Sequence, residues 1–476
     1  MTMTASDRNN TEASALLSLI KGAKNMSSTV FDSILYRDSF GSPEMRAVFD
    51  DKGLIAKYIE TEVALAKAEA TCGVIPQEAA DEIAEKSTVE TMDFDRFRHE
   101  TEIVGYPILP LVHQLNEQCG KSGGYVHWGA TTQDIMDTAN VLQIRDALNL
   151  IEADIDVLMK TLADLSVRYR DSEMAGRTHL QQALPCTFGY KTSIWLAQMM
   201  RHKERLNELK PRVLVGEFGG AAGTLASLHG KGLEVQAEMM KELGLGVPMS
   251  SWHVARDGFA EAVNFCSLVT GTLGKIGFDV MLLSMNEVGE VYEPFVKGRG
   301  ASSTMPQKRN AISSELMLAC AKGVRQLAGL MVDAQIHDLE RATGPWHAEW
   351  IAIPEAFMLT AGALKQAKFL LGGLIVDEER MRQNLQISRG CIVAEAVMMG
   401  LAEFVGRQVA HDVVYDACRV VNTKGGTLAE VLKSMPEVAD RIDAAHIDSL
   451  CDPANYVGQC PEMVDKVVDA YKAKYC

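Results

Sequence analysis

The sequence contains no CxxC pair, and none of its ten cysteines stands at a zinc-like spacing from histidine. Scattered single cysteines are typical of buried thiols in a reducing compartment, so we expect a cytoplasmic protein without a metal site. The HExxH, P-loop and GxSxG motifs are absent as well. The common peptidase, nucleotide-phosphate and esterase signatures therefore give no lead to function.

Positive charge is in short supply. The chain has 47 Lys and Arg against 63 Asp and Glu, a formal net charge of −16. This balance argues against nucleic acid or an anionic membrane surface as a general partner, and an anionic substrate would need a local cationic pocket. The start, MTMTASDRNN, lacks the basic and apolar regions of a secretion signal, and Lys275 and Asp279 interrupt the most apolar stretch. No membrane span is expected.

Proline is missing over long stretches of the chain. None lies between Pro110 and Pro185 or between Pro248 and Pro294, which leaves room for very long helices. Apolar residues at spacings of 3, 4, 3, 4 and 3 support this interpretation, namely Cys266, Val269, Leu273, Ile276, Val280 and Leu283. Such a repeat is typical of helices packed nearly parallel in a bundle or subunit core. Strand-like alternation is nearly absent, so we predict an all-α fold around a central long-helix bundle.

The length of 476 residues is compatible with roughly three domains. The first stretch is polar and is interpreted as a loose extension, the next contains short helical runs punctuated by proline, and the long-helix region follows. Short amphipathic runs separated by Gly, Asn and Asp end the chain. The predicted boundaries are an extension at 1–30, an N-terminal helical domain at 31–120, a central bundle at 121–375 and a C-terminal helical domain at 376–476.

The stretch GRGASSTMPQKRNAISSE, residues 298–315, combines a pliable hydroxyl-rich loop with a Lys-Arg pair. Pro306 limits the loop, and a helix is predicted from about Ala311. A serine in such a loop can act as a base only if its alkoxide is stabilised, which backbone N–H groups near a helix start and Lys308 could do. Lys308 and Asn310 could also hold a substrate carboxylate. The alternative is a solvated loop before an ordinary helix.

A second stretch, HWGATTQDIMDTA at residues 127–139, precedes a long helix-compatible run. Thr131, Thr132 and Asp134 resemble a helix-capping cluster, and capping alone accounts for at least one of them. If this helix start faces a cleft, its free N–H groups and the two threonines would bind a carboxylate.

A third stretch, GRTHLQQALPCTFG at residues 176–189, contains His179. A single histidine is more often structural than catalytic, but one held by a carboxylate such as Glu315 could protonate a leaving group. The glycine-rich FGGAAGTLAS lacks the strand-turn-helix context of a nucleotide loop and is interpreted as close helix packing. ERATGPWHAEW, which includes Arg341, is a candidate pocket wall or interface.

Residues 301–310, ASSTMPQKRN, resemble the signature loop of the fumarase/aspartase superfamily, G-S-S-x-M-P-x-K-x-N. The other two stretches follow the order of that superfamily on a long-helix chain, and the resemblance covers about residues 31–470. It implies three helical domains, a homotetramer built on a central bundle, and active sites to which three subunits contribute. It also implies that no metal or organic cofactor takes part.

By this resemblance, Ser302 removes a proton next to a carboxylate, and Lys308 and Asn310 stabilise the resulting aci-carboxylate. Elimination at the neighbouring carbon then gives a fumarate-like alkene. His179, paired with Glu315, would serve as the acid that protonates the leaving group. The substrate-binding positions implied by the resemblance are Thr131, Thr132, Thr178, Gln181, Ser303, Asn310 and Arg341.

Within the superfamily, the overall sequence is most similar to bacterial 3-carboxy-cis,cis-muconate cycloisomerase, with adenylosuccinate lyase next. Bacterial cycloisomerases of this type carry Trp where this chain has His179 and lack an acidic residue at Glu315. A His-Glu pair suits proton exchange with an amine, which favours C–N elimination or addition. Adenylosuccinate lyases use an N-terminal Arg-Tyr for the nucleotide phosphate, whereas this chain reads Tyr36-Arg37. Ala255, Ala301 and Ala311 also depart from the common pattern.

The leading hypothesis is therefore a lyase for an N-substituted aspartate or similar succinyl compound, such as iminodisuccinate, with fumarate as product or intermediate. Re-addition of the amine to either face of fumarate would make it an epimerase. The alternatives are the muconate cycloisomerase, adenylosuccinate lyase and, in a different class, a non-catalytic structural protein of the crystallin type. The expected partner is a small di- or tricarboxylate.

Overall fold

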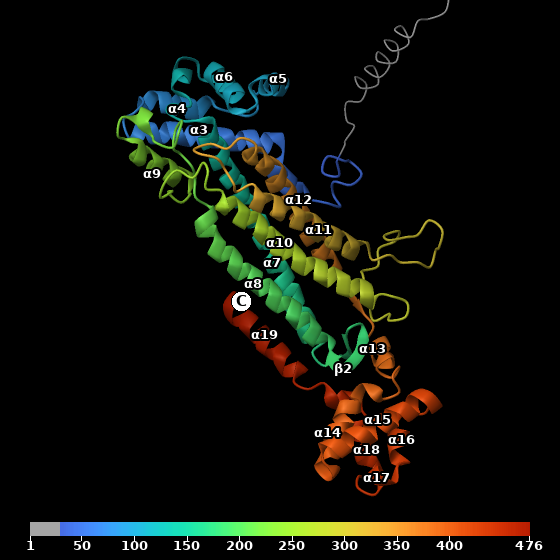
Figure 1. The fold of residues 1–476 in the computed structure, drawn as a ribbon. Coiled ribbons are helices and arrows are strands. Elements are labelled where there is room, and N and C mark those ends of the chain that lie inside the picture. Colours follow the sequence, from blue (N-terminus) through green and yellow to red (C-terminus); the bar gives the residue numbers. More distant parts are fainter. Residues whose placement is uncertain (1–28) are drawn as a thin grey trace, which may run out of the picture.

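The computed structural model describes residues 29–476, so the predicted extension at 1–30 lies almost entirely outside the described residues. The molecule is elongated, with short helices at one end, long helices along the middle and a compact helical group at the other end (Figure 1). Nearly all of the regular structure is helical, which confirms the predicted all-α class.

Short helices punctuated by proline form the first part of the described chain. They are α2 (Pro43–Phe49), α3 (Asp51–Thr71), α4 (Gln77–Lys86), α5 (Phe94–Val104) and α6 (Ile108–Cys119), followed by a 3-10 turn at Gly120–Tyr125. Pro43 starts α2, and Pro76 and Pro107 immediately precede α4 and α6. Proline fits these positions because a helix start has no use for its missing N–H.

Five long helices form the central bundle: α7 (Thr132–Arg168), α8 (Phe188–Val213), α10 (Asp257–Leu283), α11 (Ile312–Asp333) and α12 (Pro345–Gly372). The shorter α9 (Gly232–Leu243) packs on α3. With 37 residues, α7 is about 55 Å long and separates the two ends of the bundle. All six residues of the predicted apolar repeat on α10 are at most 6% exposed, so they form part of the core.

Helix α10 is also long and apolar enough to cross a membrane by length and composition alone. More than half of its most apolar window is buried inside the protein, and Lys275 pairs with Asp279 on the helix. This is how the central helix of a bundle core looks, because its apolar surface is covered by neighbouring helices.

A β-hairpin that the sequence analysis did not predict joins α7 to α8. Strands β1 (Glu173–Thr178) and β2 (Gln181–Thr187) pair antiparallel, and Thr178 faces Gln181 at the turn. The two turn residues, His179 and Leu180, have φ angles of 52° and 63°. Two-residue turns of this kind normally use Asn or Gly, so the sequence carries no turn signal there. A second small pair joins β3 (Val291–Tyr292) to β4 (Ile375–Val376).

The C-terminal part contains a separate apolar core. Its helices are α13 (Glu378–Leu385), α14 (Ala394–Val405), α15 (Arg407–Lys424), α16 (Leu428–Lys433), α17 (Pro436–Ala439), α18 (Ala444–Leu450) and α19 (Cys460–Tyr475). The segment from Val397 to Ile447 surrounds its own core, whereas Val464, Val468 and Tyr471 of α19 pack into the core of the bundle. The domain boundaries stay a prediction, and the chain returns to the bundle at its end (Figure 1).

Candidate active site

The signature loop projects from the bundle between α10 and α11 (Figure 1). Its base is held by a backbone bridge between Ala301 and Arg309 and by the N–H of Asn310, which donates to the Gly300 carbonyl oxygen at 3.0 Å. The side-chain amide of Asn310 donates to the same oxygen, also at 3.0 Å. In this chain, Asn310 therefore holds the loop closed as well as standing at a predicted substrate-binding position.

The hydroxyl oxygen of Ser302 accepts two backbone hydrogen bonds inside the loop. The N–H groups of Thr304 and Met305 donate to it at 3.3 and 3.0 Å. Two donors on one oxygen stabilise its negatively charged form, which is what a serine base requires. Ser303, by contrast, contacts only the Thr304 hydroxyl, at 3.5 Å. The local backbone thus distinguishes the two neighbouring serines.

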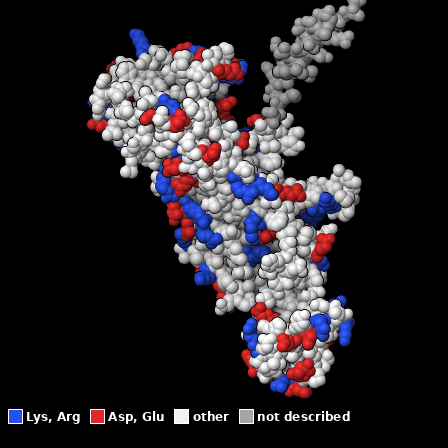
Figure 2. All heavy atoms as spheres, in the orientation of Figure 1, with Lys and Arg blue, Asp and Glu red and all other residues white. Residues whose placement is uncertain are grey.

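The side chain of Lys308 is exposed and forms no ion pair or hydrogen bond with any described residue. It lines a cavity of about 160 Å³ together with Arg299 and Arg309. Figure 2 shows basic side chains on this projecting segment, against a surface where both signs of charge are mixed. The loop thus supplies the local positive charge that an acidic protein needs to attract a carboxylate.

The start of α11 is fixed to the base of the loop. Glu293 is buried and accepts hydrogen bonds from the backbone N–H groups of Ser313 and Ser314, at 3.2 and 2.8 Å. Arg299 donates to the Ser313 hydroxyl at 2.6 Å. Glu315 follows in the same turn, is exposed, and has no partner among the described side chains.

Thr131 and Thr132 lie at the start of α7, as predicted. Asp134 accepts a hydrogen bond from the backbone N–H of Thr131 at 2.9 Å, so this carboxylate closes the helix start from below. Both threonines are half-buried, and the side chain of Thr132 has no partner among the described residues. They remain available to a ligand at a helix terminus that favours negative charge.

Arg341 lies at the same end of the bundle. Its Nε donates to the side-chain oxygen of Gln133 at 3.0 Å. Gln133 directly follows Thr132 in the chain, so the guanidinium lies close to the start of α7. Its Nη2 atom is buried and has no partner among the described residues. Leaving a buried N–H donor without an acceptor costs free energy, and a substrate carboxylate would provide the missing acceptor.

A buried ion network stabilises this end of the bundle. Arg256 donates to both oxygens of Asp137, at 2.6 and 2.8 Å, and to both oxygens of Glu349, at 2.8 and 2.5 Å. All three side chains are fully buried, and they join α7, the start of α10 and α12. Breaking such a network leaves an unpaired buried charge, so it fixes the three helices relative to one another.

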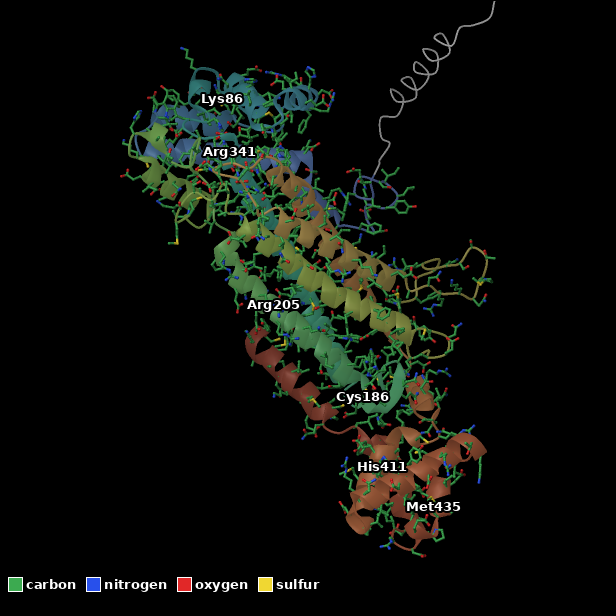
Figure 3. All side chains as sticks on the ribbon, in the orientation of Figure 1. Lys86, Cys186, Arg205, Arg341, His411 and Met435 are labelled. Carbon is green, nitrogen blue, oxygen red and sulfur yellow. The ribbon has the colours of Figure 1, made fainter. Side chains whose placement is uncertain are left out.

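The third predicted group is on the hairpin at the other end of α7. Thr178, His179 and Gln181 are exposed at its turn. The hairpin is held by Arg177, which donates to both oxygens of Glu290 at 2.9 and 2.6 Å. Figure 3 shows Arg341 near one end of the molecule, and Cys186, on β2, far along the bundle toward the C-terminal helices that contain His411 and Met435.

One chain therefore brings only some of the predicted residues together. Thr131, Thr132 and Arg341 share one end of α7, while the hairpin lies beyond the opposite end, about 55 Å away by the length of the helix. Within the described residues, no hydrogen bond or ion pair joins His179 to Glu315 or to the loop.

Sequence reasoning missed a second histidine beside the threonines. His127 has a φ of 62°, and its Nδ1 lies 2.7 Å from the Oε1 of Glu62, which is buried on α3. Burial lowers the pKa of His127, but the adjacent Glu62 carboxylate outweighs this, and the net shift is upward. A non-glycine residue with positive φ marks a constrained position, although the sequence alone gives no sign of it.

Comparison with known proteins supports one family. The family model described as "Lyase" matches residues 38–325, and the model described as "Adenylosuccinate lyase C-terminus" matches residues 390–467. Together they cover the chain from α2 through the loop to the first part of α11, and the helices α14 to α18, whereas α12 lies outside both.

Two characterised relatives cover nearly the whole chain. Trans-aconitate decarboxylase 1 of Mycosarcoma maydis is 46% identical, over 90% of this chain and 88% of the relative. N-acetyl-S-(2-succino)cysteine lyase of Dickeya dadantii is 37% identical, over 93% of this chain and 98% of the relative.

Two solved structures share the fold. A fumarate lyase from Mesorhizobium sp. BNC1 has a TM-score of 0.85 and 52% identity, covering 90% of this chain and 98% of its own. The 3-carboxy-cis,cis-muconate lactonizing enzyme of Pseudomonas putida has a TM-score of 0.88 and 38% identity, covering 93% and 99%. The overall fold is thus shared by proteins whose names differ in reaction.

Proposed function

Because this chain belongs to the fumarase/aspartase superfamily and is an enzyme of that superfamily, we propose that it cleaves or forms a bond next to a carboxylate of a succinyl compound. The favoured reaction is β-elimination of an amine from an N-substituted aspartate, such as iminodisuccinate, with fumarate as product or intermediate. The observation that carries the proposal is the Ser302 hydroxyl, which accepts two backbone hydrogen bonds at 3.3 and 3.0 Å.

The proposed chemistry starts at Ser302. Its oxygen takes a proton from the carbon next to a substrate carboxylate, and the electron pair moves into that carboxylate to form the aci-carboxylate. Lys308 in the same loop offsets the added charge. The C–N bond at the neighbouring carbon then breaks, and the leaving amine takes a proton from His179, oriented by Glu315. Thr131, Thr132 and Arg341 hold the second carboxylate.

This chemistry requires more than one copy of the chain. The groups that it uses lie at opposite ends of a helix about 55 Å long. Antiparallel packing of bundles from a second copy would bring one chain's α7 start to another chain's loop. Helix α10 offers a suitable face, because Leu268 and Phe278 are 51% and 49% exposed and Gly271 between them is exposed. We therefore propose a homo-oligomer, with a tetramer as the expected state.

A second candidate is the muconate cycloisomerase. The likeness to the lactonizing enzyme of Pseudomonas putida favours it. The His179 and Glu315 side chains count against it, because lactonisation does not need a group that exchanges a proton with an amine. The relatives' names also include decarboxylation of trans-aconitate and cleavage of a succinyl-cysteine. Adenylosuccinate is retained as a test substrate.

The test is a substrate panel with matched variants. Purified protein is incubated with iminodisuccinate stereoisomers, adenylosuccinate, S-succinocysteine, trans-aconitate and 3-carboxymuconate, with fumarate followed by ultraviolet absorbance and products by proton NMR in heavy water. Fumarate, or scrambled stereochemistry with deuterium beside a carboxylate, is expected from the amine substrate. Lactone from the muconate alone would replace the leading proposal with the second candidate.

The variants test the role of Ser302. Ser302→Ala should lower kcat by about 10²–10⁴-fold while the protein stays folded, because the base is removed. Ser303→Ala is the comparison: as a predicted substrate-binding position it should raise KM more than it lowers kcat, since its hydroxyl accepts no backbone hydrogen bond. Equal activity of Ser302→Ala and wild type would contradict the proposed chemistry. If wild type turned over no substrate of the panel, a non-catalytic role would be favoured.

A further inference from the structure

A group of three buried ionisable side chains lies directly beneath the start of α7. Asp134 comes from α7, Glu217 from the segment after α8, and His253 from the segment before α10. One ligating atom of each lies within 4.8 Å of the others, and all three side chains are buried. None of them has a part in the chemistry proposed above.

Asp134 binds four donors and connects three segments of the chain. One oxygen accepts hydrogen bonds from Gly219 N–H at 2.9 Å and from His253 Nε2 at 2.7 Å. The other accepts from Thr131 N–H and Gly220 N–H, both at 2.9 Å. Asp134 is therefore the direct link between this buried group and the threonines at the start of α7.

Glu217 is the member of this group whose hydrogen bonding is not satisfied. Its Oε2 accepts a hydrogen bond from the Trp252 N–H, but Oε1 has no partner among the described residues. Oε1 lies 3.8 Å from His253 Nε2, and the side chain is fully buried. Burial, opposed by His253, raises the pKa of Glu217 to about 7. A buried carboxyl without a second partner is best satisfied by a proton.

The charges around Glu217 are few. On α7 it faces Asp134 and Asp137, and from the α10 side it faces His253. Both oxygens of Asp137 are taken by Arg256, at 2.6 and 2.8 Å. His253 Nδ1 lies 3.1 Å from the Ser251 hydroxyl. Burial lowers the pKa of His253, and Asp134 then raises it above its usual value overall. Glu217 and His253 thus share the titratable protons of the group.

A metal ion is a poorer explanation of the same three residues. A cation would have to displace donors from Asp134, whose two oxygens each already accept two hydrogen bonds. His253 likewise spends Nε2 on Asp134 and Nδ1 on Ser251. Only Glu217 Oε1 remains free among these atoms, and one free oxygen does not make a coordination site.

We propose that Glu217 is a positioning residue for the carboxylate-binding end of the site: when protonated it adds no charge beneath Thr131 and Thr132, and when ionised it weakens the binding of an anion there. The proposal rests on the proposed function only in taking the start of α7 as a carboxylate site. It assigns the end with Thr131 and Thr132 a pH dependence that does not come from the substrate.

The expected effect is on binding and not on turnover. As pH rises from about 6 to 8.5, Glu217 ionises and adds a negative charge 3.8 Å from His253, which contacts Asp134 beneath the threonines. KM for the anionic substrate should rise on the order of three- to tenfold, with kcat following a separate profile. In Glu217→Gln, which keeps the size and an acceptor for Trp252 N–H, this rise should largely disappear.

The test measures two quantities over that pH range: KM for whichever substrate is turned over, and Kd for succinate as a non-reactive dicarboxylate probe. Glu355→Gln is the matched control, because burial also raises the pKa of that carboxyl but it lies in the middle of α12. The control should keep the wild-type slope. His253→Gln is a second variant, which should move the rise to higher pH, because His253 lowers the pKa of Glu217.

The outcomes separate this proposal from the proposed function. If Kd for succinate rises with pH in wild type but stays constant in Glu217→Gln, the positioning role is supported, even if no substrate of the panel is turned over. Identical slopes in wild type and Glu217→Gln, or no succinate binding by wild type, would overturn it. Micromolar Zn²⁺ or Mn²⁺ binding that Glu217→Gln abolishes would also overturn it and assign a metal site.

Discussion

At the scale of single residues, three buried carboxyl groups of the described chain have an oxygen without a hydrogen-bond partner. Glu217 and Glu62 each leave one oxygen unsatisfied, and Glu69 on α3 leaves both. Glu69 is fully buried, and burial, with the nearby Glu62, raises its pKa to about 9. It is therefore neutral at physiological pH. Glu69 and Glu217 lie toward the end of the bundle that contains His127 and the threonines, and burial raises the pKa of each.

Glu69 makes the stability of the protein depend on pH. The unfolded chain releases this proton near pH 4.5, whereas the folded chain retains it up to about pH 9, so the free energy of unfolding falls as pH rises through that window. Glu69→Gln removes this titration. Relative to wild type it should gain on the order of 1–3 kcal/mol between pH 5 and 8. Denaturant unfolding at several pH values measures the difference.

An exposed carboxyl provides the control for this experiment. Glu78→Gln in α4 also removes one acidic group, but its side chain is in water in both states. It should change the pH dependence little. Parallel curves for wild type and Glu69→Gln would show that the Glu69 carboxyl finds a partner or water that satisfies it.

At the scale of elements, the loop between α10 and α11 depends on close backbone contact at its base. A Cβ on Gly300 would lie 2.4 Å from the Asn310 carbonyl oxygen, and the φ of Gly300 is 67°. Gly298 has a φ of 85°, but a Cβ there would meet nothing within 4 Å. Both glycines thus have a positive φ, which disfavours any other residue, but only at Gly300 would a Cβ also clash with a neighbouring backbone oxygen.

This difference predicts unequal effects of two alanine substitutions. Gly300→Ala should lower kcat about tenfold or more, because opening the loop base moves Ser302 and Lys308, while the melting temperature changes little. Gly298→Ala has the same backbone cost without the clash and should have a smaller effect. Steady-state kinetics and thermal unfolding measure both. Equal kinetics for the two variants would mean that the loop base does not position the serine.

At the scale of the whole molecule, the length of α7 decides how an active site can form. The predicted residues lie at both ends of a helix about 55 Å long, so they act on one small substrate only where different copies of the chain meet. If different copies supply the two ends, two inactive variants should complement each other. Ser302→Ala and Thr132→Val damage opposite ends of the bundle.

Mixing these two variants tests shared sites. After co-expression or co-refolding, random association leaves roughly a quarter of sites with both native residues, so roughly a quarter of the wild-type activity should return. Each variant alone should stay near background. A mixture of Ser302→Ala with Lys308→Met gives the control, because both residues come from one loop and their mixture should recover much less. Absence of recovery in the first mixture would contradict a site shared between chains.

Much of the fold and part of the site could be predicted from the sequence. The apolar repeat on α10 predicts a bundle because its spacing is set by the helix itself, and all six residues are buried. The start of α7 at Thr132 follows from local capping chemistry. The hairpin from Glu173 to Thr187 could not be predicted, because its turn uses His179 and Leu180, which carry no turn preference.

The sequence by itself determined the fold class, because helical periodicity depends on short-range spacing along the chain, and its resemblance to a known signature loop identified the superfamily and the serine and lysine in that loop. Only the tertiary structure decided which groups meet. It paired His127 with Glu62, 65 residues apart, placed Glu217 and His253 beneath the start of α7, and separated the hairpin from the threonines. Contacts between distant residues depend on how long helices pack, and no local pattern records that packing.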